Sequence, residues 1–135
     1  EKNTVVQRRD NVVEVTFLDP EKVILQVLRI EMEDVKGNVA VSFTEYFNAS
    51  LESLKQSGLE LLGVSGDTDV VERMNKTIYY RVAIFRNREG FTYYYVFAAW
   101  GFKSRLYKAQ LAALKEPQAL KSIIYMMTMI AAYQR

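Results

Sequence analysis

The side chains of this 135-residue chain that could do chemistry are carboxylates, lysines, arginines and tyrosines, because it contains neither cysteine nor histidine. Their absence excludes thiolate and imidazole nucleophiles, zinc sites built on Cys or His, and Ser-His or Cys-His catalytic pairs. Catalysis would have to use carboxylates, lysine, tyrosine or backbone groups, and no motif for such chemistry is present. We therefore expect a protein that is not an enzyme and has no cofactor, metal or catalytic residue.

Two acidic clusters have the residue types to bind a hard cation or to take part in acid–base chemistry. Asp67, Asp69 and Glu72 follow a glycine, but their spacing lacks the later glycine and the terminal glutamate of a calcium loop. Glu31, Glu33 and Asp34 form the second cluster, and Glu31 and Glu33 alternate with apolar residues, which places them on the polar face of a strand. We therefore interpret both clusters as solvated surface.

The most suggestive group combines aromatic and basic side chains in the second half of the chain. A sheet that presents aromatics beside arginines and lysines can stack bases and bind phosphates. Consecutive tyrosines such as Tyr93, Tyr94 and Tyr95 point to opposite faces of a strand, however, and no RNP-like string is present. We prefer an aromatic core with an amphipathic rim that binds a protein partner. The candidate partner-binding residues are Arg81, Arg86, Arg88, Trp100, Lys103 and Arg105.

The charge of the chain is divided unevenly, although its net charge is only +2. Residues 1–72 carry seven Lys and Arg against 14 Asp and Glu, a net charge of −7. Residues 73–135 carry 11 against two, a net charge of +9. The two parts could neutralise each other within one domain or between copies of it, so a homo-oligomer is one expectation.

Hydrophobic periodicity and turn signals predict a single domain over residues 12–135, preceded by a polar N-terminal arm over residues 1–11. The predicted strands span 12–18, 23–33, 59–64, 70–74, 77–86 and 91–102, and the predicted helices span 42–58, 105–115 and 118–135. This order, β-β-α-β-β-β-β-α-α, predicts the α+β class, with an antiparallel β-sheet flanked by helices in an α/β/α sandwich.

Local signals set the predicted helix boundaries. Ser42 and Glu45 form a capping box at the start of the first helix, and Gly58 is placed to cap its end. Ser104 is a candidate cap for the second helix, which Pro117 breaks before the third begins.

The order of elements from Val39 to Ile130 resembles the PsbP/DcrB-like group, whose fold is an antiparallel sheet between helices. The matching pieces are the helix Ser42–Gly58, the turn Asn75-Lys76-Thr77, the strand Ile78–Arg86, the aromatic strand Tyr93–Trp100 and the pair Ile123-Ile124. The chain departs from the group by lacking the glycine of that turn and by having two final helices in place of one. The resemblance implies an exported protein, often a lipoprotein or lumenal accessory subunit, that binds partners and does not turn over substrate.

We therefore expect a non-enzymatic binding or accessory protein, lipoprotein-like and extracytoplasmic, that acts through a protein-partner surface. Its location would be periplasmic, lumenal or at a membrane through a removed N-terminal segment, with the cytoplasm as the alternative. A nucleic-acid or anionic-ligand binding module that uses the basic and aromatic residues is a second possibility, and a carboxylate or tyrosine enzyme is a third. No run of about 18 apolar residues is present, so no transmembrane span is predicted.

Overall fold

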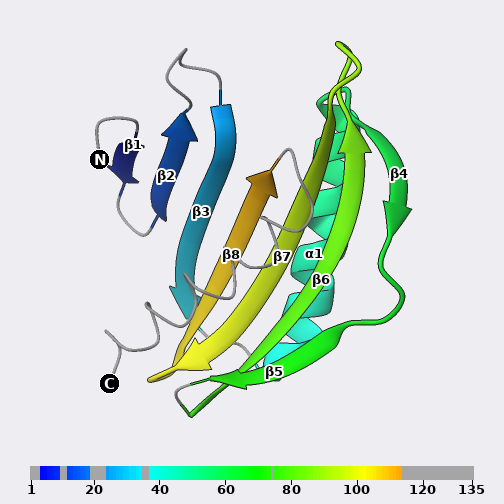
Figure 1. Ribbon diagram of the computed structural model, residues 1–135. Coiled ribbons are helices and arrows are strands. Elements are labelled where there is room, and N and C mark those ends of the chain that lie inside the picture. Colours follow the sequence, from blue (N-terminus) through cyan, green and yellow to red (C-terminus); the bar gives the residue numbers. More distant parts are fainter. Residues whose placement is uncertain (1–3, 10–11, 19–23, 35–36, 74, 114–135) are drawn as a thin grey trace.

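The computed structural model describes residues 4–9, 12–18, 24–34, 37–73 and 75–113. Within these ranges a helix and a series of strands follow one another along the chain (Figure 1). They are β1 (Thr4–Arg9), β2 (Val12–Leu18), β3 (Ile24–Asp34), α1 (Val39–Gln56), β4 (Glu60–Val64), β5 (Asp69–Arg73), β6 (Lys76–Arg86), β7 (Thr92–Phe102) and β8 (Arg105–Ala113). A helix with an antiparallel sheet confirms the predicted α+β class.

The eight strands form one sheet in the order β1-β2-β3-β8-β7-β6-β4, and β5 pairs with β6 beside this path. Every pairing is antiparallel. β3 and β8 are neighbours although α1 and four strands separate them in the sequence, and their register sets Arg29 opposite Gln110 and Glu31 opposite Lys108. This pairing joins the acidic first part of the chain to the basic second part inside a single sheet.

The N-terminus of α1 is fixed by an asparagine. The Asn38 side-chain oxygen accepts hydrogen bonds from the backbone amides of Ala40 and Val41, at 2.7 and 3.3 Å. Such a cap satisfies amides that would otherwise lack a partner in the first turn. The helix therefore begins at Val39, and the predicted capping residue Ser42 lies inside the first turn, which corrects the predicted start.

The C-terminus of α1 ends in a Schellman motif. Gly58 has a φ of +101°, its amide donates to the carbonyl of Lys55, and the amide of Leu59 donates to the carbonyl of Leu54. Glycine reaches this left-handed conformation without steric cost. The prediction that Gly58 caps the helix is confirmed.

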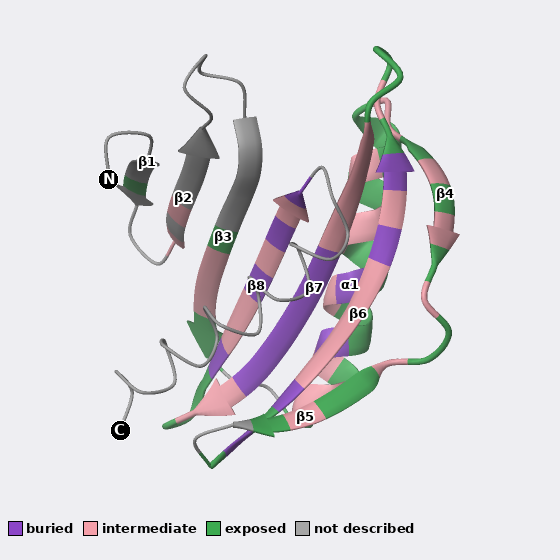
Figure 2. Cartoon of the chain, in the orientation of Figure 1, coloured by how far each residue is buried: buried purple, intermediate pink, exposed green. Residues whose placement is uncertain are grey.

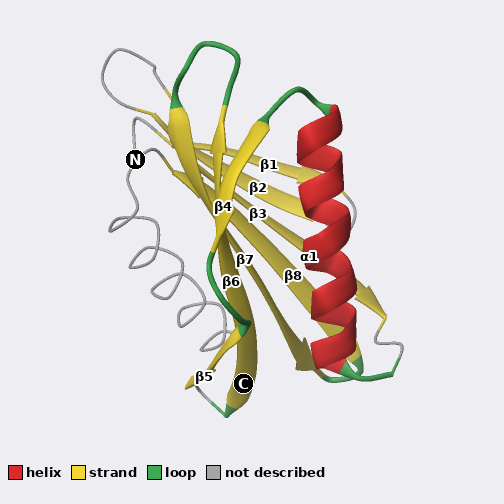
Figure 3. Cartoon of the chain, turned by 90° about the vertical axis from the view of Figure 1, so that its right-hand side faces the viewer, coloured by secondary structure: helices red, strands yellow, loops and turns green. Residues whose placement is uncertain are grey.

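The two faces of the sheet carry separate buried clusters. On the face that α1 covers (Figure 3), the buried side chains are Phe43, Phe47, Ala83, Phe85, Phe97, Ala99 and Leu106. On the opposite face they are Ile78, Val96, Ala98, Trp100, Ala109, Leu111 and Ala113. Among the residues whose burial is described, Figure 2 shows that the buried sheet residues are concentrated in the long central strands β6, β7 and β8. These strands are therefore a well-packed part of the sheet on which a site can be built.

The segment 105–115, predicted as a helix, instead forms β8 over Arg105–Ala113. Lys103 and Ser104 have φ values of +50° and +65°, and the flanking residues Phe102 and Arg105 are paired. Two central residues with positive φ are typical of the tight turns that join antiparallel strands. Ser104 therefore turns the chain into a hairpin and does not cap a helix, and β8 pairs along its length with the aromatic strand β7.

The N-terminal segment also differs from its prediction. Thr4–Arg9, expected to belong to a polar arm, form β1 and pair with β2 from Thr4 opposite Phe17 to Arg9 opposite Val12. Charged residues suit an edge strand, because they discourage further strand pairing. The predicted helix 118–135 lies outside the described residues. Among the described residues, no helix has the length and apolar character that a bilayer crossing requires.

Candidate ligand cleft

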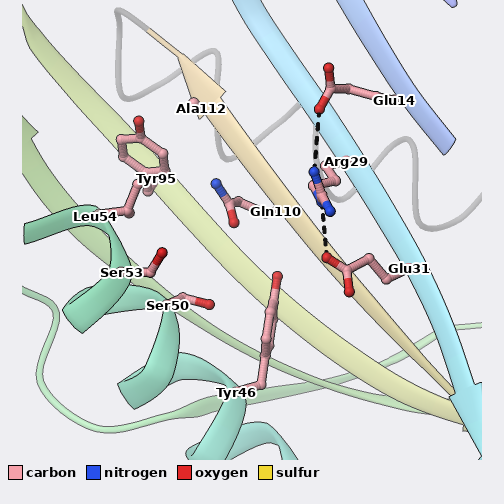
Figure 4. Close-up of a pocket in the computed structure, with 10 residues that line it drawn as sticks. All are labelled: Glu14, Arg29, Glu31, Tyr46, Ser50, Ser53, Leu54, Tyr95, Gln110 and Ala112. Carbon is pink, nitrogen blue, oxygen red and sulfur yellow. Dashed lines mark hydrogen bonds and ion pairs between the residues drawn. The ribbon is translucent and has the colours of Figure 1, made fainter. Parts of the chain in front are cut away.

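A cleft lies between α1 and strands β3, β8 and β7, on the helix-covered face of the sheet (Figure 4). Its volume is about 510 Å³. Such a volume lies in the range of roughly 300–1,000 Å³ that is usual for ligand sites. The lining residues are Glu14, Arg29, Glu31, Tyr46, Ser50, Ser53, Leu54, Tyr95, Gln110 and Ala112. We call this feature the α1–β3 cleft.

One wall of the cleft is a ladder of ion pairs that crosses β2, β3 and β8. Arg29 Nε donates a hydrogen bond to Glu31 Oε1 at 2.9 Å, and Arg29 Nη1 lies 3.8 Å from Glu14 Oε2. Lys108 Nζ lies 2.5 Å from Glu33 Oε1 and 3.9 Å from Glu31 Oε2. Strand register places Glu14 opposite Arg29 and Glu31 opposite Lys108. The backbone pairing therefore holds these charges close together before any ligand arrives.

Tyr46 projects from α1 into the cleft and links the helix to the sheet. Its hydroxyl donates a hydrogen bond to the carbonyl oxygen of Ala109 at 3.2 Å, and the Lys108 ammonium lies 5.2 Å from its ring centroid. Burial, with a further contribution from the Glu31 carboxylate, raises the pKa of Tyr46 well above its ordinary value. Tyr46 consequently keeps its proton and acts as a hydrogen-bond donor.

The floor of the cleft is formed by Gln110 of β8 and Tyr95 of β7 (Figure 4). The Tyr95 ring packs edge-to-face against Phe85 at 5.4 Å and stacks on Phe97 at 6.0 Å, so its position is fixed by the core. Burial raises the pKa of Tyr95, and the neighbouring Tyr93 adds to this shift. Within the described part of the chain, neither the Gln110 amide nor the Tyr95 hydroxyl has a hydrogen-bond partner.

A second, smaller hollow lies on the other side of the contact between Tyr46 and Lys108. It has a volume of about 260 Å³ and is lined by Glu33, Ser42, Glu45, Tyr46, Leu106 and Lys108. The helix positions from Ser42 to Ser53 that line the two hollows span about 16 Å at the usual rise per residue. The two hollows therefore lie one after the other along α1, on either side of the contact between Tyr46 and Lys108.

Each hollow is lined by more carboxylates than cations. Glu14 and Glu31 accompany Arg29 in the α1–β3 cleft, and Glu33 and Glu45 accompany Lys108 in the smaller hollow. A cleft with such a surplus raises the local concentration of cations and repels anions. Among the described residues, however, no group of three carboxylates is arranged to hold a metal ion.

Three of the arginines predicted to contact a partner lie at the β6–β7 side of the sheet, each with its own neighbour. Arg81 Nε donates to the carbonyl oxygen of Ser65 at 3.2 Å, and its guanidinium lies over the ring of a buried phenylalanine of α1. Arg86 forms an ion pair with Glu60 at 2.9 Å. The Arg88 guanidinium lies against the C-terminal end of α1. The loop, strand and helix contacts of these side chains give each of them a local structural role.

The other three predicted contact residues lie elsewhere. Lys103 lies in the turn between β7 and β8 and Arg105 directly follows it, at the end of β7 opposite to Arg86. Trp100 is 1% exposed, on the face away from α1, and stacks on Tyr107 with ring centroids 5.7 Å apart. The length of an 11-residue strand, roughly 35 Å, separates the two ends of β7. The structure thus does not bring the six residues into one patch, and their contact with a partner stays a prediction.

None of the six predicted contact residues is among those that line the α1–β3 cleft. The sequence predicts no functional role for Arg29, Tyr46 and Gln110, which line the cleft. Glu31, which also lines it, is interpreted from the sequence as a solvated surface residue. One signal was available: Lys108 and Gln110 are polar residues at alternate positions in a segment of otherwise apolar character. With a strand over 105–113, this alternation predicts a polar strip on one face.

Comparison with known proteins supplies a fold but no family. The sequence matches no known family, and no curated protein is similar to it. A crystal structure similar to this chain is that of PA94 from Pseudomonas aeruginosa, a protein of unknown function. The TM-score is 0.52 at 10% sequence identity, and the match covers 94% of each chain. This similarity supports the α+β fold with its antiparallel sheet and carries no information about function.

Proposed function

We propose that this chain is a non-enzymatic binding or accessory protein that holds an extended segment of a protein partner in the α1–β3 cleft. The observation that carries the proposal is the floor of this cleft. There, Gln110 of β8 and Tyr95 of β7 both line the cleft, held by the central strands, and neither side chain has a hydrogen-bond partner in the described part of the chain. Both side chains are half-buried, so a ligand that supplies hydrogen-bond partners for them would be stabilised by the bonds formed.

The form of the cleft favours an extended peptide as the ligand. The part of α1 that lines the cleft, from Tyr46 to Leu54, is about 12 Å long at the usual rise per residue. This length matches roughly four residues of extended chain at 3.3 Å per residue. A glutamine side chain carries both a donor and an acceptor, so Gln110 can pair with both polar groups of a peptide unit. The length of this part of the helix and the amide on the floor of the cleft thus support a peptide backbone as the ligand.

The chemistry near Tyr46 supports binding over catalysis. Tyr46 and Glu31 do converge in the cleft, which is the arrangement that a carboxylate or tyrosine enzyme would need. The shift in the pKa of Tyr46 is upward, however, which makes this hydroxyl a weaker proton donor than a free tyrosine. Its hydroxyl is also engaged by the carbonyl of Ala109. Glu31 accepts a hydrogen bond from Arg29, so both groups serve to position the walls of the cleft.

The resemblance to the PsbP/DcrB-like group supports an exported, lipoprotein-like accessory protein, because such proteins act by binding. The alternative, a nucleic-acid or anionic-ligand module, draws its support from the net charge of +9 over residues 73–135. The surplus of carboxylates in the α1–β3 cleft favours a protein segment there over a polyanion.

Peptide display tests the proposal. Random hexapeptides displayed on phage are selected against the folded protein, and the selected peptides are synthesised and their affinities measured by fluorescence polarisation. Ser53→Trp places a bulky side chain in the cleft, and Asn48→Trp, on an exposed part of the same helix outside the cleft, is the matched control. We expect selected peptides to bind the wild type and Asn48→Trp alike and to lose at least about tenfold in affinity for Ser53→Trp, which corresponds to the loss of one good contact. Failure to select any peptide, or equal binding to Ser53→Trp, would overturn the proposal.

A further inference from the structure

We infer that β5 is a self-association site, at which two copies of this chain pair their β5 strands antiparallel about a two-fold axis at Val71. The partner that this strand edge accepts is therefore a second copy of the chain. The contact lies on the β6 side of the sheet, outside the α1–β3 cleft, so the inference does not depend on the proposed function. It is carried by an open strand edge, a charge pattern that is complementary to itself, and apolar side chains that the pairing covers.

β5 is paired on one side and open on the other. It pairs with β6 from Asp69 opposite Tyr80 to Arg73 opposite Lys76, and β7 occupies the other side of β6. Among the described residues no further strand pairs with β5, so it lies at the margin of the sheet (Figure 1). A strand that pairs on one side directs part of its backbone N–H and C=O groups outward. These groups form a template on which another strand can pair.

The charges of β5 are complementary when the strand meets its own copy in the opposite direction. The strand reads Asp-Val-Val-Glu-Arg over Asp69–Arg73. An axis at Val71 sets Asp69 of each copy opposite Arg73 of the other, and Val70 opposite Glu72. Opposite charges at directly opposed positions stabilise a strand pair. Within the described part of the chain the Asp69 carboxylate has no ion pair, so it is not already engaged.

The neighbouring two-fold registers are poorer. A two-fold axis that joins antiparallel strands in one sheet keeps every residue on its own face, so the axis must pass beside a residue. An axis at Val70 leaves Glu72 and Arg73 opposite residues that precede the strand of the other copy. An axis at Glu72 sets the two Glu72 carboxylates opposite each other, and directly opposed like charges are destabilising. Only the axis at Val71 pairs all five residues.

The pairing also covers apolar side chains. Val71 lies opposite Ile78 in the strand register and packs against the buried cluster on the sheet face away from α1. At the axis the two Val71 side chains meet, so this cluster extends from one copy into the other. Val70 is 55% exposed, and pairing opposite Glu72 removes part of its surface from water, which is favourable. Because a five-residue strand is a short contact, the dimer should form in a concentration-dependent way.

Single cysteines test the contact, and they are diagnostic because the chain contains no cysteine. Val71→Cys places two thiols at the axis with Cα atoms about 4.5–5.5 Å apart, inside the range of roughly 4.4–6.8 Å that disulfides span. Val70→Cys is the matched control, because Val70 is more exposed but lies about 7–8 Å diagonally from its copy. Under mild oxidation we expect Val71→Cys to form a linked dimer several-fold faster. Equal rates, or a faster reaction of Val70→Cys, would overturn the inference.

Charge reversal tests the register. Asp69→Arg and Arg73→Asp each turn both attractive pairs into repulsive ones, so each variant alone should lose at least about tenfold in dimer affinity, measured by sedimentation equilibrium. An equimolar mixture of the two variants restores two attractive pairs and should associate as the wild type does. Asp67→Arg, an equal change of charge at an exposed residue of the loop before β5, is the control and should leave the dimer affinity unchanged.

The outcomes decide the inference in both directions. The wild type should change from monomer to dimer within a range of about 1 µM to about 1 mM. A chain that stays monomeric over this range contradicts the inference, and so does a dimer of unchanged affinity in both charge variants. A mixture that associates no better than its components contradicts the register even if each variant alone is weakened. Circular dichroism of each variant excludes unfolding, and an associating mixture shows independently that both variants are folded.

Discussion

Replacing Phe97 by alanine should remove the central support of the cleft at a cost that can be derived from its contacts. Phe97 is 0% exposed, and its ring contacts Phe47, Tyr46 and Tyr95 with centroid distances of 5.4, 6.0 and 6.0 Å. Truncation of a buried phenylalanine to alanine costs about 3–5 kcal/mol in free energy of unfolding. Because three aromatic contacts are lost together, we expect a value near the middle of that range, about 4 kcal/mol.

Urea denaturation, followed by circular dichroism and by Trp100 fluorescence, measures this loss. For a domain of this size, 4 kcal/mol lowers the melting temperature by roughly 10–15 °C. Phe91→Ala is the control, since Phe91 is 55% exposed just before the same strand, and a surface substitution changes stability by at most about 0.5 kcal/mol. A loss below about 1.5 kcal/mol for Phe97→Ala, or equal losses for the two variants, would refute the described packing of α1 on β7.

Two further predictions concern the helix start and the buried tyrosine. Asn38→Ala should lower the free energy of unfolding by about 1 kcal/mol, whereas Ser42→Ala should change it little, because Asn38 caps the first turn; equal effects in thermal melts would contradict the assigned cap. Because the pKa of Tyr46 is higher in the folded than in the unfolded chain, the unfolded chain loses this proton first, so the contribution of Tyr46 to stability is complete below about pH 10 and declines as the pH rises further. Urea titrations between pH 8 and 11 should therefore show a steeper alkaline loss for the wild type than for Tyr46→Phe, and parallel curves would show that Tyr46 is not shifted.

Local sequence signals were sufficient for much of the fold. The aromatic strand and the one before it were predictable because alternation and β-branched or aromatic residues coincide there. The end of α1 was predictable because a left-handed glycine at that place has few alternatives. In both cases the deciding interaction lies within a few residues of the signal, so a single sequence contains it.

The errors arose where a distant partner decides the structure. The turn formed by Lys103 and Ser104 has no glycine or asparagine, the residues that usually mark a tight hairpin. Without that signal, the sequence favours the interpretation of Ser104 as a helix cap. The segment that follows is alanine- and leucine-rich, which favours a helix intrinsically, but pairing with β7 and β3 on its two sides outweighs that preference. The α1–β3 cleft was not predictable for the same reason, because its wall requires β3 and β8 to be neighbours.

The position of the cleft follows from the widths of the two layers. Seven strands side by side extend over roughly 29 Å at the usual spacing, whereas a helix with its side chains is only about 10–12 Å wide. Among the described elements, α1 makes its main contacts with β7, β6, β4 and β8, so its edge runs above the boundary between β8 and β3. At that edge the sheet face changes from the buried Phe97 and Leu106 to the charged Arg29 and Glu31. An extended segment that runs along this edge would cover the part of the face that one helix is too narrow to reach. The same geometry thus explains why the polar residues of β3 are tolerated in the fold and why they are accessible to a ligand.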